Sequence, residues 1–381
     1  MRLLYNKTMK EIWVLDIGSG KLVFLSGKKS LSGLCSVARL ETVDYDGFYG
    51  GEWLSPEKLR DDVASVIPVG VKRPSTLYVG VPGDFLNFRN NTVHTRFDCV
   101  KTVTRGDVDR LSAEGNIYSS DKRRTVIASA TCGFRLDGGE FVVDPVGRQT
   151  ASLSSDVTYI LCESDFCDAI AAAVAPYGFK DVCFVSSFWA ECTTMIDGYA
   201  RTKGAVVVDV GYMSSSAAYV IGDGFDGEVT METGYATIAG ALIEKFSLDG
   251  DEAERLLAEV NLGYGDDETY MLDARDGVLS FSAGAVHDAV RGELDKLASV
   301  IASLRGDGDA ELYVTGGGLS AVKGALAYIG GAVDCTPQTF APSVPMYTKP
   351  WLSSAFGTFD AACKTERGNS LFGRLLDKIR R

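Results

Sequence analysis

An aspartate, small residues and a lysine lie between two apolar runs near the start of the chain. The stretch EIWVLDIGSGKLVFLSG, residues 11–27, has the pattern of a strand, a tight turn and a second strand. Glycines let the backbone approach an oxyanion, and backbone N–H groups, a hydroxyl and a lysine can bind it. An aspartate at the strand end can hold a hydrated Mg²⁺. The residues that would form this phosphate site are Asp16, Gly18, Ser19, Gly20 and Lys21.

Two other phosphate-binding patterns do not fit this stretch. A P-loop requires glycine five residues before its Gly-Lys and a hydroxyl residue after it, but Leu15 and Leu22 occupy these positions. A dinucleotide fingerprint requires a helix after its second glycine, whereas residues 24–27 have strand character. A plain hairpin turn with a surface lysine stays open as the alternative.

The same pattern recurs about half the chain later. VVVDVGYMSSSAAYV, residues 206–220, is again an apolar strand that ends in Asp-x-Gly and is followed by hydroxyl residues and a second strand. The recurrence indicates a duplicated domain, whose two copies would place two aspartates around one polyphosphate. The corresponding candidates are Asp209, Gly211, Ser214 and Ser215.

A triple glycine completes the set of motifs. AELYVTGGGLSAVKGAL, residues 310–326, predicts a strand, a glycine turn and a helix that starts near Ser320. Glycines leave no side chains between the backbone and a flat base or ribose, and a helix N-terminus favours an anionic neighbour. The candidates are Gly316, Gly317 and Gly318; an ordinary strand-to-helix loop is the alternative.

Composition narrows the class of protein. A chain of 381 residues with 46% hydrophobic content predicts two or more domains with well-buried cores. The net charge of −13 argues against a nucleic-acid partner. No apolar run reaches the ~18 residues of a membrane-spanning helix, and no signal-peptide pattern is visible, so we expect a cytosolic protein. The nine cysteines include no C-x-x-C pair, which predicts buried free thiols; His94 and His287 lack metal-ligand spacing.

In this order and at these spacings, the three motifs resemble the actin, Hsp70 and sugar-kinase superfamily. The two Asp-x-Gly hairpins are similar to its phosphate loops, and VTGGGLS is similar to its adenosine motif. The resemblance implies an α/β, actin-like two-domain fold with a nucleotide cleft. It also implies ATP as the cofactor, with Mg²⁺ held through water by Asp16 and Asp209.

Within the superfamily the chain resembles the FtsA family of cell-division proteins over nearly its whole length. VTRGDVDRL, with Thr104 as the predicted helix N-cap, and FRLDGGEFVVDPVGRQTASL are similar to stretches of the inserted subdomain 1C, which FtsA shares with PilM. The expected boundaries are 1–85 and 163–203 for subdomain 1A, 86–162 for 1C, 204–235 and 306–366 for 2A, 236–305 for 2B, and 369–381 for a C-terminal membrane helix.

The last residues, NSLFGRLLDKIRR, form an amphipathic pattern. At 100° per residue the apolar side chains fall within an arc of about 140°. From Lys364 onward there are six basic and two acidic residues, a net charge of +4 in an acidic chain. Such a helix can lie in a membrane interface, but about 16 Å is too short to cross a bilayer. The alternative is docking on the protein's own core. The membrane residues would be Leu371, Phe372, Arg374, Leu375, Leu376, Lys378 and Ile379.

The second hairpin departs from the family pattern. Tyr212 and Met213 occupy two positions at which the FtsA pattern has glycine, and Ser216 replaces an acidic residue of that pattern. Side chains at glycine positions move the backbone away from phosphate. Farther on, Glu254 keeps the family's glutamate, a cofactor-binding position by resemblance. We expect weak ATP binding and slow or absent hydrolysis, and no catalytic residue is identified: SSFWAEC, where a water-positioning group would lie, offers only serines and a distant Glu191.

The resemblance implies a peripheral membrane adaptor in cell division. Such a protein binds the C-terminal tail of FtsZ, polymerises with itself, contacts an anionic membrane surface, and lies on the cytoplasmic face of the membrane at the division site. FtsZ would dock on subdomain 2B, around residues 239–305. Two alternatives remain: a PilM-like scaffold for type IV pilus assembly, and a small-molecule kinase, for which we find neither a catalytic Asp near a substrate cleft nor a sugar-sized insertion.

Overall fold

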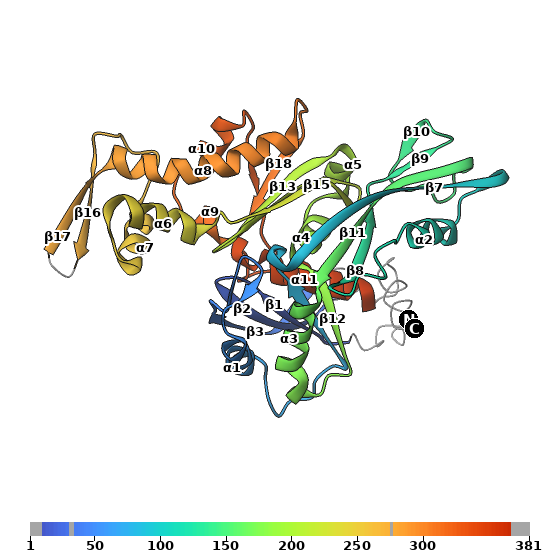
Figure 1. The fold of residues 1–381 in the computed structure, drawn as a ribbon, viewed down its shortest axis with the longest axis horizontal. Helices are drawn as coiled ribbons and strands as arrows, with labels where there is room; N and C mark the ends of the chain where they lie inside the picture. Colours follow the sequence, from blue (N-terminus) through green and yellow to red (C-terminus); the bar gives the residue numbers. More distant parts are fainter. Residues whose placement is uncertain (1–9, 30–33, 275–276, 367–381) are drawn as a thin grey trace. The chain divides into compact units, whose positions relative to one another are not determined.

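The computed structural model describes residues 10–29, 34–274 and 277–366 (Figure 1). They form two compact units, between which the chain passes more than once. The first holds the described residues up to 204, with 220–226 and 354–366, and the second holds 205–219 and 227–353. This division assigns the last described helix to the first unit, whereas the expected boundaries placed 306–366 in the second domain.

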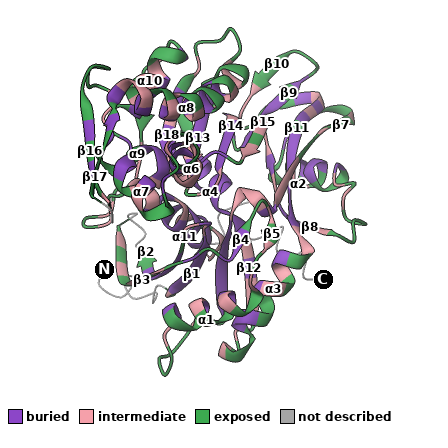
Figure 2. Cartoon of the chain, turned by 60° about the vertical axis from the view of Figure 1, so that its left-hand side comes forward, coloured by how far each residue is buried: buried purple, intermediate pink, exposed green. Residues whose placement is uncertain are grey.

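The first unit is built on a sheet with strand order β12-β6-β1-β2-β3. β1 pairs with β2 antiparallel and with β6 parallel, which places Asp16 opposite both Val23 and Gly80. Every residue of β1 is buried, as its uninterrupted apolar run predicts (Figure 2). The strands are β1 Ile12–Ile17, β2 Lys21–Lys29, β3 Cys35–Asp44, β6 Thr76–Val81 and β12 Asp181–Ser186.

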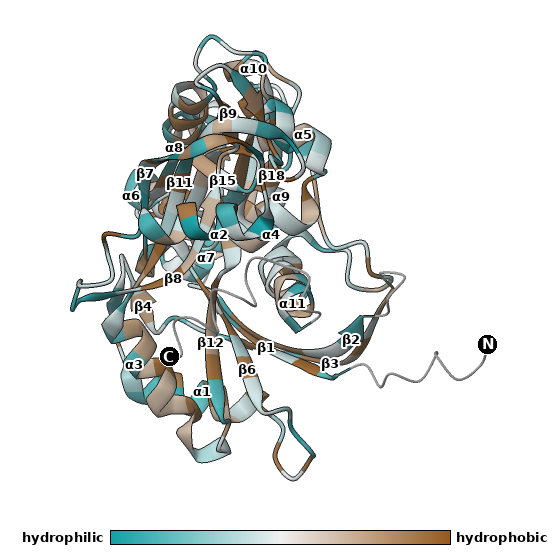
Figure 3. Ribbon diagram, turned by 90° about the vertical axis from the view of Figure 1, so that its right-hand side faces the viewer, coloured by the Kyte–Doolittle hydropathy of each residue, from teal (hydrophilic) through white to brown (hydrophobic). Residues whose placement is uncertain are grey.

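Helices cover this sheet on both faces (Figure 3). α11 lies on one face, where a Cβ at Gly27 of β2 would be 3.4 Å from the Phe359 ring; α1 and α3 lie on the other. α1 starts at an N-cap, Ser55, whose side chain accepts from the N–H of Lys58. The helices are α1 Pro56–Val66, α3 Ser164–Val174, α4 Ser187–Met195, α5 Gly198–Lys203 and α11 Ser353–Glu366.

The expected insertion forms a second sheet in the first unit, with order β10-β9-β11-β7 and β8 paired to β11. Its helix α2, Arg105–Glu114, begins at the predicted N-cap, where Thr104 and Asp107 bond each other's backbone N–H groups. Tyr159 of β11 donates to the carbonyl of Ser112 and fixes the helix on the sheet. The strands are β7 Leu86–Thr102, β8 Arg124–Thr131, β9 Phe134–Leu136, β10 Glu140–Val142 and β11 Gln149–Glu163.

The sheet of the second unit repeats the first in its strand order, β15-β14-β13-β18-β19. β13 takes the place of β1, because consecutive strands β14 and β15 follow on one side and the parallel strand β18 lies on the other. The two units therefore share the strand topology that a duplicated domain would have. The strands are β13 Ala205–Val210, β14 Ser215–Ile221, β15 Gly224–Met231, β18 Glu311–Thr315 and β19 Gln338–Thr339; the turn between β14 and β15 belongs to the first unit.

Five helices and a β-hairpin complete the described part of the second unit. Leu242 of α6, Leu257 of α7 and Leu294 of α8 are fully buried in one cluster. His287 of α8 is also fully buried; its Nδ1 lies 3.0 Å from Asp266 Oδ1 and its Nε2 lies 3.0 Å from Tyr270 Oη. The elements are α6 Tyr235–Phe246, α7 Gly250–Glu259, β16 Thr269–Ala274, β17 Gly277–Ser282, α8 Ala283–Arg305, α9 Gly317–Ser320 and α10 Ala325–Ala332.

Candidate functional site

The first hairpin closes through its backbone. The N–H of Gly18 donates to the carbonyl of Lys21 over 2.9 Å, and a Cβ at position 18 would lie only 2.9 Å from that same oxygen. Glycine is therefore required by the turn itself. Ser19 is buried at the tip, whereas the side chain of Lys21 is half-exposed and forms an ion pair of 2.5 Å with Asp44 of β3. An incoming phosphate would compete with that carboxylate for the lysine.

Asp16 is held by two side-chain hydrogen bonds. It is buried at the end of β1, where Ser187 donates to Oδ1 over 2.7 Å and Ser354 donates to Oδ2 over 2.5 Å. Burial raises the pKa of Asp16 above its ordinary value, and the two hydroxyl donors oppose that rise. A Cβ at Gly80 would lie 2.1 Å from Oδ1, so only glycine fits beside the carboxylate.

The second hairpin has the same turn as the first. The N–H of Gly211 donates to the carbonyl of Ser214 over 3.0 Å, and a Cβ at 211 would lie 2.7 Å from that oxygen. Asp209 therefore corresponds to Asp16, with the glycine two residues later in both hairpins. Ser215 has a structural role: it is buried and donates its hydroxyl to the carbonyl of Thr233.

The glycine turn packs directly against the second hairpin. Gly316 has φ +91°, and a Cβ there would lie 2.3 Å from Asp209 Oδ1; a Cβ at Gly318 would lie 2.4 Å from the carbonyl of Gly211. A Cβ at Gly317 would be 3.1 Å from that of Trp351. Gly316 and Gly318 thus allow the turn after β18 to pack closely against the end of β13 and the second hairpin. The helix that follows starts at Gly317, earlier than predicted, and ends after one turn at Ser320.

Glu254, on α7, lies beside the second hairpin. Its Oε1 accepts a hydrogen bond of 2.7 Å from the phenol of Tyr212, whose ring stacks on Tyr235. A cavity of about 550 Å³ adjoins these residues and is lined by Tyr235, Asp249, Asp251, Glu252, Glu254, Arg255 and Ala258. The structure therefore brings together, within the second unit, Asp209, Gly211, Ser214, Glu254 and the glycine turn.

Sequence analysis missed three residues that form the surroundings of Asp16. Gly80 and Ser354 come from strands and helices distant in sequence, and no motif singled them out. Ser187 lies within the SSFWAEC stretch, at the first residue of α4, but its bond to Asp16 was not foreseen. Glu191, one turn along α4, is buried beneath α11, where a Cβ at Gly357 would lie 2.9 Å from its backbone nitrogen.

The residues present fit a magnesium ion that is held mainly by water and phosphate. In the ranges that the structure describes, no three His, Cys, Asp or Glu side chains gather as metal ligands. Asp16 and Asp209 each end a central strand and supply carboxylate oxygens, the donors that Mg²⁺ prefers. Each hairpin, taken by itself, thus offers one carboxylate to a hydrated ion, whose other ligands would be water and phosphate.

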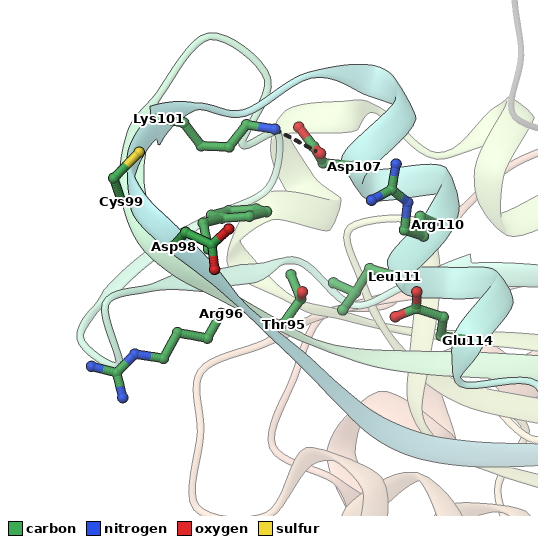
Figure 4. Close-up of a pocket in the computed structure, with 10 residues that line it drawn as sticks. Thr95, Arg96, Asp98, Cys99, Lys101, Asp107, Arg110, Leu111 and Glu114 are labelled. Carbon is green, nitrogen blue, oxygen red and sulfur yellow. Dashed lines mark hydrogen bonds and ion pairs between the residues drawn. The ribbon is translucent and has the colours of Figure 1, made fainter.

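A separate pocket of about 340 Å³ lies in the insertion of the first unit, between β7 and α2 (Figure 4). Lys101 bonds Asp107 over 2.9 Å at one end, and its ammonium lies 4.9 Å from the centre of the Phe97 ring. Basic and acidic side chains alternate around an apolar floor. The pocket is lined by Thr95, Arg96, Phe97, Asp98, Cys99, Lys101, Asp107, Arg110, Leu111 and Glu114.

The remaining expectations have mixed outcomes. All nine cysteines lie in the described ranges and are free thiols, five of them buried and Cys99 exposed. No helix among the described residues has the length and hydrophobicity needed to span a bilayer. The expected membrane helix, with Leu371, Phe372, Arg374, Leu375, Leu376, Lys378 and Ile379, lies outside the described residues.

Comparison with solved structures identifies an actin-like ATPase fold. The chain is similar to PilM in the PilM–PilN type IV pilus biogenesis complex, with a TM-score of 0.65 and 13% identity over 93% of this chain and 99% of that one. It is also similar to MreB5 of Spiroplasma citri bound to AMPPNP, with a TM-score of 0.55 and 9% identity. That match covers 94% of this chain and 98% of MreB5. A third similar structure is the ethanolamine utilization protein EutJ from Carboxydothermus hydrogenoformans, with a TM-score of 0.51 and 13% identity. That match covers 92% of this chain and 89% of EutJ.

These likenesses confirm the predicted fold class across nearly the whole chain. At such low identity they establish the fold alone, and the narrower resemblance to the FtsA family is carried forward as a proposal. No protein-family model matches the sequence, and no curated protein matches it.

Proposed function

We propose that this actin-fold chain binds ATP with Mg²⁺ through its two hairpins and its glycine turn. The observation that carries the proposal is the matched pair of turns, each closed by a glycine N–H two residues after an aspartate that ends a central strand. MreB5 of Spiroplasma citri, which has the same fold, is bound to AMPPNP in one structure and to ADP in another. Asp16 and Asp209 would hold the ion through water, and the turn amides would contact phosphate.

Slow hydrolysis is part of the proposal. Ser187, at the start of α4, donates its hydroxyl to Asp16 and so is engaged with the carboxylate. A serine is also a much weaker base than the carboxylates and histidines that commonly activate water. Nucleotide would then bias a conformational equilibrium, and its hydrolysis would not be the purpose of the protein.

The wider role that we propose is that of an adaptor in cell division. The protein would bind the C-terminal tail of FtsZ and hold FtsZ filaments on the cytoplasmic face of the membrane at the division site. Support comes from the resemblance of the insertion to FtsA and from the basic amphipathic pattern of residues 369–381. One such helix binds lipid weakly, and self-association of the actin-like body would strengthen binding through avidity.

A PilM-like role in type IV pilus assembly is the second candidate. The likeness to PilM, which covers nearly all of both chains, favours it. In this role the chain would bind the cytosolic tail of an inner-membrane pilus protein. The pocket between β7 and α2 offers an apolar floor, Phe97 and Leu111, with charged side chains around it, which suits a short peptide.

Co-sedimentation with liposomes separates the two roles. Purified protein is mixed with ATP, anionic liposomes and FtsZ filaments, beside a form that ends at Gly368 and a full-length form with Leu371→Ser and Leu375→Ser. The last keeps every basic residue and loses only apolar side chains. If only the unaltered protein carries FtsZ to the lipid, the adaptor role is supported. If no form carries FtsZ but the protein binds the pilus-protein tail, the PilM-like role replaces it.

Nucleotide binding is tested independently by calorimetric titration with ATP and Mg²⁺. Asp16→Asn, which keeps the size of the side chain and removes its charge, should weaken Mg²⁺-dependent binding at least about tenfold. Absence of binding by the folded, unaltered protein at millimolar ATP would contradict the proposal. A turnover of several per second would contradict slow hydrolysis.

A further inference from the structure

The two hairpins share their backbone and differ at their tips. Between the bonded glycine and the residue whose carbonyl it contacts, the first hairpin has Ser19 and Gly20, whereas the second has Tyr212 and Met213. A tyrosine therefore stands where the first hairpin has a small buried hydroxyl residue. The difference places a large, movable side chain on a turn that otherwise repeats the phosphate-loop geometry.

Tyr212 reaches from the hairpin to two helices. Its phenol donates to Glu254 Oε1 of α7 over 2.7 Å, and its ring stacks on that of Tyr235 of α6, with centroids 6.1 Å apart and planes inclined by 28°. Both partners also line the acidic cavity of about 550 Å³. The residue as a whole is 38% exposed. A hydrogen bond to Glu254 and a stacking contact with Tyr235 thus hold it at one edge of the cavity.

The backbone beneath the ring is fixed separately. The N–H groups of Tyr235 and Ala236 at the start of α6 donate to the carbonyls of Gly211 and Tyr212, over 3.1 and 2.8 Å. A Cβ at Gly234 would lie 2.4 Å from the carbonyl of Tyr212, so the helix start and the hairpin are in close contact. The side chain of Tyr212 can therefore rotate away without dismantling the turn.

We propose that Tyr212 is a gate on the second hairpin. In the closed form described here its phenol is hydrogen-bonded to Glu254, and the Tyr212 side chain has to move away when a nucleotide binds. The inference rests on the proposed nucleotide binding and specifies how that binding is regulated. Opening breaks a charge-assisted hydrogen bond and a stacking contact, and the apparent dissociation constant rises as the open fraction falls.

The charge around the gate indicates which part of the ligand releases it. The cavity beside Tyr212 carries the carboxylates of Asp249, Asp251, Glu252 and Glu254 against the single guanidinium of Arg255. Phosphate is repelled by such a surface, whereas hydroxyl and amino groups can donate to it. A ligand hydroxyl would replace the phenol as the donor to Glu254. Triphosphate chains without a nucleoside should therefore fail to open the gate.

The test compares Tyr212→Ser, which copies the first hairpin, with Tyr212→Phe, which keeps the ring and removes the phenol. Tyr199→Ser is the control, since it removes a 68% exposed tyrosine in the first unit. Calorimetric titration with ATP and Mg²⁺ should show about tenfold tighter binding for Tyr212→Ser and an intermediate gain for Tyr212→Phe. The control should bind like the unaltered protein, and Mg²⁺–tripolyphosphate should show no gain for either variant.

Hydrogen–deuterium exchange without nucleotide gives a second readout. Tyr212→Phe should raise exchange in peptides from α7, because the tie to Glu254 is lost while the stacking contact remains. Equal, measurable ATP affinities for the unaltered protein and Tyr212→Ser would overturn the gate and leave nucleotide binding intact. If neither binds ATP although both are folded by thermal denaturation, nucleotide binding fails and the gate fails with it.

Discussion

Ser354 and Asp16 are separated by 338 positions in the chain, yet the serine hydroxyl donates to the Asp16 carboxylate over 2.5 Å. With Ser187 on the other oxygen, it gives a buried carboxylate two neutral hydroxyl donors. Neutral donors stabilise the charged form only in part, which is why burial still raises the pKa of Asp16. The ionisation of the Asp16 carboxyl should therefore control binding of Mg²⁺ with ATP at the first hairpin.

Removing one donor should shift the pH dependence of nucleotide binding. In Ser354→Ala the pKa of Asp16 should rise further, because a donor to its ionised form is lost. Binding of Mg²⁺ with ATP requires the ionised carboxylate, so the pH midpoint of binding should move upward. Titrations from pH 5 to 8 measure the midpoint. An unchanged midpoint in a folded variant would show that Asp16 does not take part.

Gly80→Ala should be strongly destabilising. The added Cβ would lie 2.1 Å from Asp16 Oδ1 and 2.6 Å from Ser187 Oγ, in a buried site. Overpacking of this kind costs about 1–3 kcal/mol. Gly139→Ala in the same unit is the control, because nothing lies within 4 Å of its Cβ position. Urea unfolding should give a lower midpoint for the first variant and little change for the second.

Glu228 should make the stability of the protein fall as pH rises. Burial raises the pKa of Glu228 to about 7, and its only opposing influence is the hydroxyl of Thr230. Because the folded-state pKa exceeds the unfolded value of 4.5, the protonated form stabilises the fold below pH 4.5, and this contribution is lost between about pH 4.5 and 7. The loss is at most about 3 kcal/mol.

The Glu228→Gln variant checks the direction in which stability changes with pH. It should be more stable than the unaltered protein at pH 8, with a smaller difference at pH 5, as measured by urea unfolding. Glu244→Gln, an exposed position in the same unit, should show no such pH-dependent gain. If Glu228→Gln gains the same stability at pH 5 and at pH 8, Glu228 does not ionise between about pH 4.5 and 7 in the folded protein.

The two histidines should differ sharply in their contribution to stability. His287 is fully buried and both ring nitrogens have partners, whereas His94 is exposed on β7. His287→Ala removes packing and the ring's hydrogen bonds with Asp266 and Tyr270, which should lower the free energy of unfolding by about 2–4 kcal/mol. His94→Ala should change it by less than about 0.5 kcal/mol. Comparable losses in the two variants would refute this account.

Local patterns were sufficient to predict the two hairpins, the glycine turn and the N-cap at Thr104. Each depends on residues a few positions apart, because turn geometry and capping are settled within one segment. The contacts of Asp16 with Gly80, Ser187 and Ser354 could not be predicted, since three distant segments must first assemble around β1. Likewise, Tyr212 was recognised as a departure, but its bond to Glu254 depends on where α7 packs.

In both turns the closing hydrogen bond runs between backbone groups, from the N–H of Gly18 to the carbonyl of Lys21 and from the N–H of Gly211 to the carbonyl of Ser214. A substitution at position 212 or 213 therefore changes the contacts of the tip and keeps the hydrogen bond that closes the turn. The second hairpin is thus a natural place for a protein engineer to retune the chain.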